Sequence, residues 1–263
     1  MVELAGLAKA RWRFGAMHYV DWRSEAARLW ELPSLKEIEL ENFRVDASVF
    51  AWRSWEDLRG VSLRHLQEGD LAWLERCPRL EILEVWQSQR VRSLSGLERL
   101  QHLRCLALWE LGPLPTLAPV AGLAGSLEEL ILSGGIWKAQ ELLGDLGPIA
   151  QLRNLQKLIL CVRGPEDLGP ILDLPRLSEL SLPTAAYSLE EVAKVAASYE
   201  FWRKERPWIQ RLEDPDGCPK CGRPRSGLYL RRKKRIWCEV CDAVKLAKVL
   251  GDFERLIDNV RRG

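Results

Sequence analysis

Four cysteines near the C-terminal end have the spacing of a metal site. Cys218 and Cys221 form one C-x2-C pair, Cys238 and Cys241 form a second pair, and 16 residues separate the two pairs. Each pair predicts a tight turn that points both sulfurs at a common centre, and two such turns complete a tetrahedral Zn²⁺ site. Four sulfur ligands leave no position for water, so the pattern predicts a structural ion rather than a catalytic one. Two disulfides are the alternative interpretation.

A run of basic residues lies between the two cysteine pairs. Short apolar segments at 228–230 and 236–237 flank it and predict a hairpin with the run at its tip. Zinc ribbons with such hairpins often contact phosphates, which makes the run a candidate phosphate-binding site. The alternatives are a solvated turn or a surface that docks on the acidic part of the chain. The run consists of Arg231, Arg232, Lys233, Lys234 and Arg235.

The segment that follows the second cysteine pair predicts a helix. Residues 243–260 carry apolar side chains at helical spacing. The apolar stripe is broad, so we expect this helix to pack on the ribbon or to dock on the rest of the chain.

One apolar pattern recurs ahead of the cysteines. The pattern L-x-x-L-x-L, with Ile or Val at some positions, begins at Leu35, Leu58, Leu80, Leu103, Leu127, Leu155 and Leu177. Successive matches begin 23, 22, 23, 24, 28 and 22 residues apart. The last two apolar residues of each match point to one side of a short strand. Stacking one strand per repeat therefore predicts a parallel sheet that covers a continuous core.

These residues resemble the leucine-rich-repeat family, whose repeats span about 20–29 residues. The resemblance implies an α/β solenoid with a parallel sheet on its concave face and short helices in return segments such as 70–76 and 139–143. With its CPKCG and CEVCDAVKLAK segments, the chain resembles bacterial leucine-rich-repeat proteins that end in a zinc ribbon. That resemblance implies no substrate. The chain departs from the family pattern because asparagine is absent three residues after the last strand leucine, which puts regular curvature in doubt.

The pattern divides the chain into four parts. We expect an N-terminal cap at 1–34, repeats at 35–187, a capping helix and linker at 188–212, and a zinc ribbon with its terminal helix at 213–263. The N-terminal cap should contain a strand around Trp12–Tyr19 and a helix near Ser24–Trp30. At the other end, Ser188 and Glu191 form a capping box, which opens a helix that should run to about Arg206.

The residues that flank the strand leucines should line the concave face in three columns. Trp86 and Trp109 fall on adjacent strands, and the first strand offers an acidic edge made by Glu37, Glu39 and Glu41. Exposed apolar patches and tryptophans are typical of binding sites. The alternatives are tryptophans that pack under a loop or the N-terminal cap, or that form a homodimer contact. The candidate partner-binding residues are Trp86, Trp109, Ile82, Glu84, Ile131, Ile159 and Arg64.

Composition and charge indicate a globular protein with two parts of opposite net charge. Apolar residues make up 47% of the 263 residues, and the formal net charge is +2. Residues 218–263 hold 13 Lys and Arg against 5 Asp and Glu, whereas 1–217 hold 26 against 32. The apolar runs are too short for a membrane span, and no signal peptide is recognisable. The chain has seven cysteines, an odd number. Together with the lack of a recognisable signal peptide, this number predicts a cytoplasmic, reducing environment.

The sequence contains no convincing catalytic constellation. Spacing pairs none of the remaining cysteines with a histidine, and neither a Gly-rich phosphate loop nor a nucleophile elbow is present. A RING-type ligase module needs eight ligands, whereas four cysteines and no histidine follow residue 200. We therefore expect a non-catalytic scaffold that binds a protein partner, with Zn²⁺ as its cofactor and no small-molecule substrate. A nucleic-acid-associated protein is the alternative. The remaining cysteines are Cys77, Cys105 and Cys161, and the histidines are His18, His65 and His102.

Overall fold

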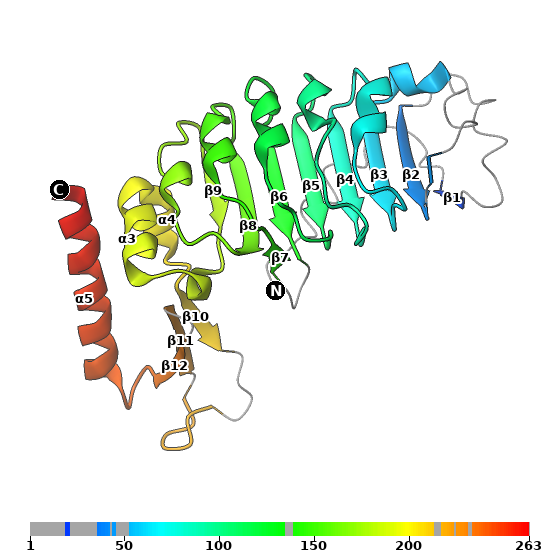
Figure 1. Cartoon of the computed structure of the whole chain (residues 1–263). Coiled ribbons are helices and arrows are strands. Elements are labelled where there is room, and N and C mark those ends of the chain that lie inside the picture. The colour runs from blue at the N-terminus through cyan, green and yellow to red at the C-terminus, as the bar shows by residue number, and fades with distance from the viewer. Residues whose placement is uncertain are drawn as a thin grey trace.

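The computed structural model describes residues 19–21, 36–42, 44–45, 53–134, 139–212, 217–223, 225–230 and 233–262. It consists of a solenoid followed by a helical cap and a small ribbon (Figure 1). The solenoid strands are β1 (Tyr19–Asp21), β2 (Glu37–Glu41), β3 (Gly60–Arg64), β4 (Ile82–Trp86), β5 (Cys105–Trp109), β6 (Glu129–Ser133), β7 (Gln140–Glu141), β8 (Lys157–Arg163) and β9 (Glu179–Ser181). The remaining elements are α3 (Leu189–Ser198), α4 (Glu200–Glu205), β10 (Ile209–Leu212), β11 (Arg225–Leu230), β12 (Lys233–Cys238) and α5 (Ala243–Arg262).

The solenoid strands pair in parallel, in the order β1-β2-β3-β4-β5-β6-β8-β7, with β9 also on β8. This confirms the leucine-rich-repeat fold and the predicted register. Equivalent residues of successive repeats face one another, so three columns run across the sheet. The first column is Glu37, Gly60, Ile82, Cys105, Glu129, Lys157 and Glu179. The middle column is Glu39, Ser62, Glu84, Ala107, Ile131, Ile159 and Ser181. The third runs from Glu41 through Arg64, Trp86, Trp109 and Ser133 to Cys161.

The other side of the sheet faces a continuous core. The second core-facing residue of each repeat strand, from Leu40 in β2 to Leu160 in β8, is fully buried. Most leucines of the return segments are fully buried as well. Each buried leucine stabilises the fold by about 1.5–3 kcal/mol relative to an exposed one. No single repeat encloses its own leucines, so the repeats are stable only as a stack.

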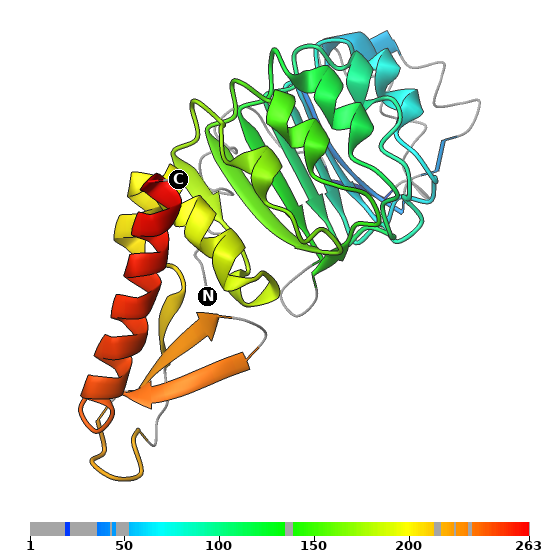
Figure 2. The ribbon, with the colours of Figure 1, turned by 60° about the vertical axis from the view of Figure 1, so that its left-hand side comes forward.

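The return segments are mostly short 3₁₀ helices that line one side of the solenoid (Figures 1 and 2). The segment predicted at 70–76 forms such a helix at Ala72–Arg76. The helix predicted at 139–143 is wrong, because Gln140 and Glu141 form β7 and pair with Val162 and Arg163 of β8. The longest repeat, which begins at Leu127, therefore contains a second parallel strand, β7, in addition to β6.

A ladder of left-handed residues takes the place of the missing asparagines. Asn42, His65, Gln87 and Glu110 each follow a strand with φ near +50°. Each donates its backbone N–H to a carbonyl of the next strand, as His65 does to Trp86 at 3.1 Å. Side chains satisfy other turn groups: Ser88 Oγ accepts from the N–H of Leu66, and Gln140 Oε1 accepts from that of Leu111. Different side chains therefore satisfy the turns in successive repeats.

Two helices close the C-terminal end of the solenoid. The predicted capping box is confirmed at its first bond, since Ser188 Oγ accepts a hydrogen bond from the N–H of Glu191. The single helix expected up to Arg206 is divided at Tyr199, which is extended, into α3 and α4. At the N-terminal end, the helix near Ser24–Trp30 and most of the strand around Trp12–Tyr19 lie outside the described residues. Tyr19 opens β1 and pairs with Glu39.

The ribbon and its helix pack against this cap. β10, β11 and β12 form an antiparallel sheet, so the ribbon sheet starts at Ile209, before the expected boundary at 213. α5 lies against α3 (Figure 2). Its Phe253 and Ile257 are buried and join the same apolar core as the repeats. Among the described residues, no helix has the length and apolar character needed to cross a membrane.

Candidate metal centre and concave face

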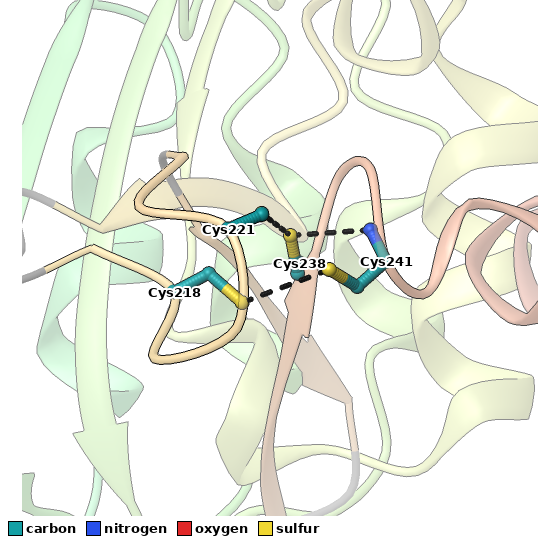
Figure 3. Close-up of side chains that lie close together, drawn as sticks. All are labelled: Cys218, Cys221, Cys238 and Cys241. Carbon is teal, nitrogen blue, oxygen red and sulfur yellow. Dashed lines mark hydrogen bonds between the residues drawn. The ribbon is translucent and has the colours of Figure 1, made fainter.

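The four C-terminal cysteines converge at one point (Figure 3). Their sulfurs all lie within 4.8 Å of one another. The Sγ atoms of Cys221 and Cys238 are 3.4 Å apart, and those of Cys218 and Cys241 are 4.0 Å apart. Four sulfurs bound tetrahedrally at about 2.3 Å from one Zn²⁺ would be separated by about 3.8 Å. The residues therefore fit a metal ion with four sulfur ligands.

Backbone geometry positions the first cysteine pair. The N–H groups of Cys221 and Gly222 both donate to the carbonyl of Cys218, at 3.2 and 2.7 Å. Gly222 has φ +68°, a left-handed conformation that glycine adopts without steric cost. The chain then turns back, and the carbonyl of Arg223 accepts a hydrogen bond from the N–H of Cys218 at 2.9 Å.

The second pair is positioned by a side chain that sequence reasoning missed. Asp242 Oδ2 accepts a hydrogen bond from the N–H of Cys238 at 3.1 Å, and the Asp242 carbonyl accepts from Leu246 in the first turn of α5. Asp242 therefore links the cysteine turn to the helix. The available signal was its position directly after the fourth cysteine of the motif.

Hydrogen bonds within the cluster shift the pKa values of two of these cysteines in opposite directions. The N–H of Cys241 donates to Cys238 Sγ and lowers the pKa of Cys238 to about 6. In contrast, a bond with Cys221 raises the pKa of Cys241 to about 12. Four thiolates that point at one centre repel one another, so they require a metal charge to balance them. Lys220 and Arg223 are exposed near the cluster and would offset the remaining negative charge.

The predicted phosphate-binding run is described in part. Lys233, Lys234 and Arg235 begin β12, opposite Leu230, Tyr229 and Leu228 of β11. Arg231 and Arg232 lie outside the described residues. The backbone thus confirms the antiparallel hairpin, with longer strands than expected, and phosphate binding stays a prediction.

The predicted partner-binding residues come together on the concave face, with uneven exposure. Trp86, Ile82, Glu84 and Ile159 are half-buried. Trp109 is 7% exposed and Ile131 1% exposed, so both are more buried than a freely exposed patch would require. With Ala107, they form an apolar cluster that is separate from the main core.

Trp86 lies between two partners. Its ring stacks on Trp109, with centroids 4.9 Å apart and planes 8° apart. The guanidinium of Arg64 lies over the Trp86 ring, 5.6 Å from its centroid. Arg64 Nε also donates to Glu39 Oε1 at 2.6 Å, which fixes the arginine in place. Both faces of Trp86 are therefore in use, and its edge is the part left for a partner.

The other cysteines have the environment of structural residues. Burial raises the pKa of Cys77 to about 12 and also raises the pKa of Cys161. Cys105 Sγ lies 4.0 Å from Glu129 Oε2, while His65 Nδ1 lies 3.2 Å from the carbonyl of Gln87. High thiol pKa values oppose nucleophilic reactivity.

Three solved structures are similar to this chain. An internalin from Listeria monocytogenes is 18% identical, with a TM-score of 0.42, over 60% of this chain and 49% of that chain. Internalin C2 from the same organism is 19% identical, with a TM-score of 0.41, over 56% and 63%. A leucine-rich-repeat protein from Leptospira interrogans is 15% identical, with a TM-score of 0.39, over 68% and 57%. The aligned part is thus less than two thirds of each of these chains.

No protein-family model matches the sequence, and no curated protein matches it. The repeat assignment rests on the register of this chain's own strands.

Proposed function

We propose that this protein is a non-catalytic scaffold whose concave face binds a protein partner. The observation that carries the proposal is the separate apolar cluster around Trp86 and Trp109 on the side of the sheet that faces away from the core. A tryptophan held by stacking loses little side-chain entropy on binding, which is the character of an interface hot spot. We assign Trp86, Ile82, Glu84, Ile159 and Arg64 to the partner-facing set, in which Trp109 and Ile131 are the buried members of the cluster.

We further propose that Cys218, Cys221, Cys238 and Cys241 hold a structural Zn²⁺. Convergence of four sulfurs within 4.8 Å supports this assignment. The ion would supply folding free energy to a ribbon that has little core of its own. Sulfur ligation needs reduced cysteines, and on this ground we place the protein in the cytoplasm.

Affinity capture from lysate tests the binding role. The bait is the full chain, as wild type or as Trp86→Ala, each with and without nuclease. Leu143→Ala is the matched control, since Leu143 is 68% exposed and lies outside the three columns. We expect a protein retained by the wild type and by the control, lost with Trp86→Ala, and indifferent to nuclease.

Two other results would count against the concave face. Capture that disappears with nuclease but survives Trp86→Ala would favour the alternative function, in which the basic ribbon contacts nucleic acid. Equal capture by wild type and Trp86→Ala, with nuclease making no difference, would place the binding surface elsewhere on the molecule.

A further inference from the structure

The concave face carries more negative charge than its own cations balance. The three columns hold Glu37, Glu39, Glu41, Glu84, Glu129 and Glu179 against Arg64 and Lys157, a net charge of −4. Both cations are already paired on this face, Arg64 with Glu39 at 2.6 Å and Lys157 with Glu179 at 2.5 Å. The face therefore complements a partner that brings positive charge.

Glu37 is the carboxylate of this face to which we assign a cation of the partner. It makes no hydrogen bond or ion pair with another described residue. Its side chain lies over Gly60, where an added Cβ would be 3.0 Å from Glu37 Cγ. Partial burial raises the pKa of Glu37, because the charged form is less well solvated there. A cation supplied by a partner would restore the interaction that water provides elsewhere.

A second unsatisfied group lies in the apolar cluster of the same face. Trp109 is 7% exposed, and its buried Nε1 has no hydrogen-bond acceptor among the described residues. A buried N–H without an acceptor lacks the hydrogen bond that water gives to an exposed one. Because this nitrogen is buried, a bound segment reaches it only if the side chains around it move.

The apolar part of the face fits an aliphatic or aromatic side chain and not a nucleobase. Both faces of the Trp86 ring are covered, by Trp109 and by Arg64, so no base can stack on it. The excess carboxylates would also repel phosphates. What Trp86 offers is its ring edge. Ile82 occupies the opposite end of the same strand, two strands or about 10 Å from Glu37.

We propose that the partner of the concave face is a protein segment that carries Lys or Arg beside an apolar side chain. The cation pairs with Glu37, and apolar side chains of the segment pack on Ile82 and on the edge of Trp86. This inference rests on the proposed binding function of the face and specifies the chemistry of the occupant.

Selection from a phage-displayed library of random peptides tests the proposal. The immobilised target is the full chain, with counter-selection on Trp86→Ala. Enriched peptides are then measured by fluorescence polarisation against wild type, Glu37→Gln and Glu56→Gln. Glu56 is the matched control, because it is an exposed carboxylate on the 3₁₀ helix Arg53–Asp57, away from the columns.

We expect enrichment of peptides that combine Lys or Arg with apolar residues. Their affinity should fall about fivefold to tenfold with Glu37→Gln and stay unchanged with Glu56→Gln. Binders that depend on Trp86 but are neutral or acidic, or that ignore Glu37→Gln, would overturn this inference and leave the proposed function standing. A complete lack of binders that depend on Trp86 would contradict the proposed function itself.

Discussion

The solenoid and the ribbon depend on different sources of stability. In the solenoid, fully buried leucines recur in every repeat and merge into one core. Among the ribbon residues whose side chains the structure describes, Cys218 and Cys238 are buried, and the apolar side of α5 is buried against the cap. A stack of repeats generates its own core, whereas a small module must use a metal or a neighbour.

The contact between the two regions shows how the ribbon uses its neighbour. Trp208 packs against both Trp202 and Phe253, with centroids 5.4 and 5.1 Å apart. Arg203 donates to Glu254 and Asp258 on α5, at 2.8 and 2.9 Å. The helix that follows the last cysteine is therefore also the outer layer of the solenoid cap.

The largest effect is expected at the metal site, where a substitution should unfold the ribbon and leave the solenoid folded. Cys238→Ser should abolish stoichiometric zinc binding and unfold the ribbon sheet, because metal binding supplies about 10 kcal/mol or more to such modules. Amides of β3 to β6 should remain protected from hydrogen exchange. Elemental analysis and hydrogen exchange measure both results, and Cys161→Ser is the control that should keep its zinc. Retention of one zinc per chain by Cys238→Ser would refute the four-sulfur site.

The second-largest effect is expected in the solenoid, where a substitution should lower stability and leave the metal bound. Leu106→Ala removes a fully buried side chain in β5 and should lower the free energy of unfolding by about 2–5 kcal/mol. Zinc content should not change. Denaturant unfolding measures the loss, with Leu143→Ala as the exposed control, for which we expect little change. A loss of zinc from Leu106→Ala would show that the two regions fold as one unit.

A smaller effect is expected on the concave face. Trp86→Ala should cost about 1.5 kcal/mol or less, since it removes one stacked pair from a half-buried position. Thermal unfolding measures the change. A loss comparable to that of Leu106→Ala would mean that Trp86 is a core residue and not a binding residue.

The smallest effect concerns the contact between the regions. Arg203→Ala should weaken the packing of α5 by about 1 kcal/mol, because the Arg203 side chain is partly solvated and its ion pairs are screened. Hydrogen exchange should become faster in α5 while zinc stays bound. A double-mutant cycle with Glu254→Ala measures the coupling energy between the two side chains. A coupling energy of zero would contradict this prediction.

Sequence periodicity predicted the solenoid because strand side chains alternate and the repeat length sets the register. For this reason, the columns that contain Glu37, Trp86 and Cys161 were placed correctly. The convergence of the four cysteines followed from their spacing in the same way. Both are local patterns, fixed by residues close together in the chain.

The features that were missed depend on contacts between distant segments. Trp109 belongs to an exposed column, yet its neighbours bury it. Gln140 and Glu141 carry no strand signal, and β7 forms because β8 extends past its neighbours to Val162 and Arg163. The apolar stripe of α5 did not reveal whether it faces the ribbon or the cap, because its partners, such as Trp208 and Arg203, lie far away in the sequence.

Photo-crosslinking from the concave face tests the central claim most directly. A photoreactive amino acid replaces Ile159, which is half-buried in the middle column, and in a control chain replaces the exposed Leu143. After irradiation in cells, mass spectrometry identifies what is attached. We predict a protein joined to position 159 and absent from position 143. Crosslinks to nucleic acid, or equal crosslinking from both positions, would contradict a protein-binding concave face.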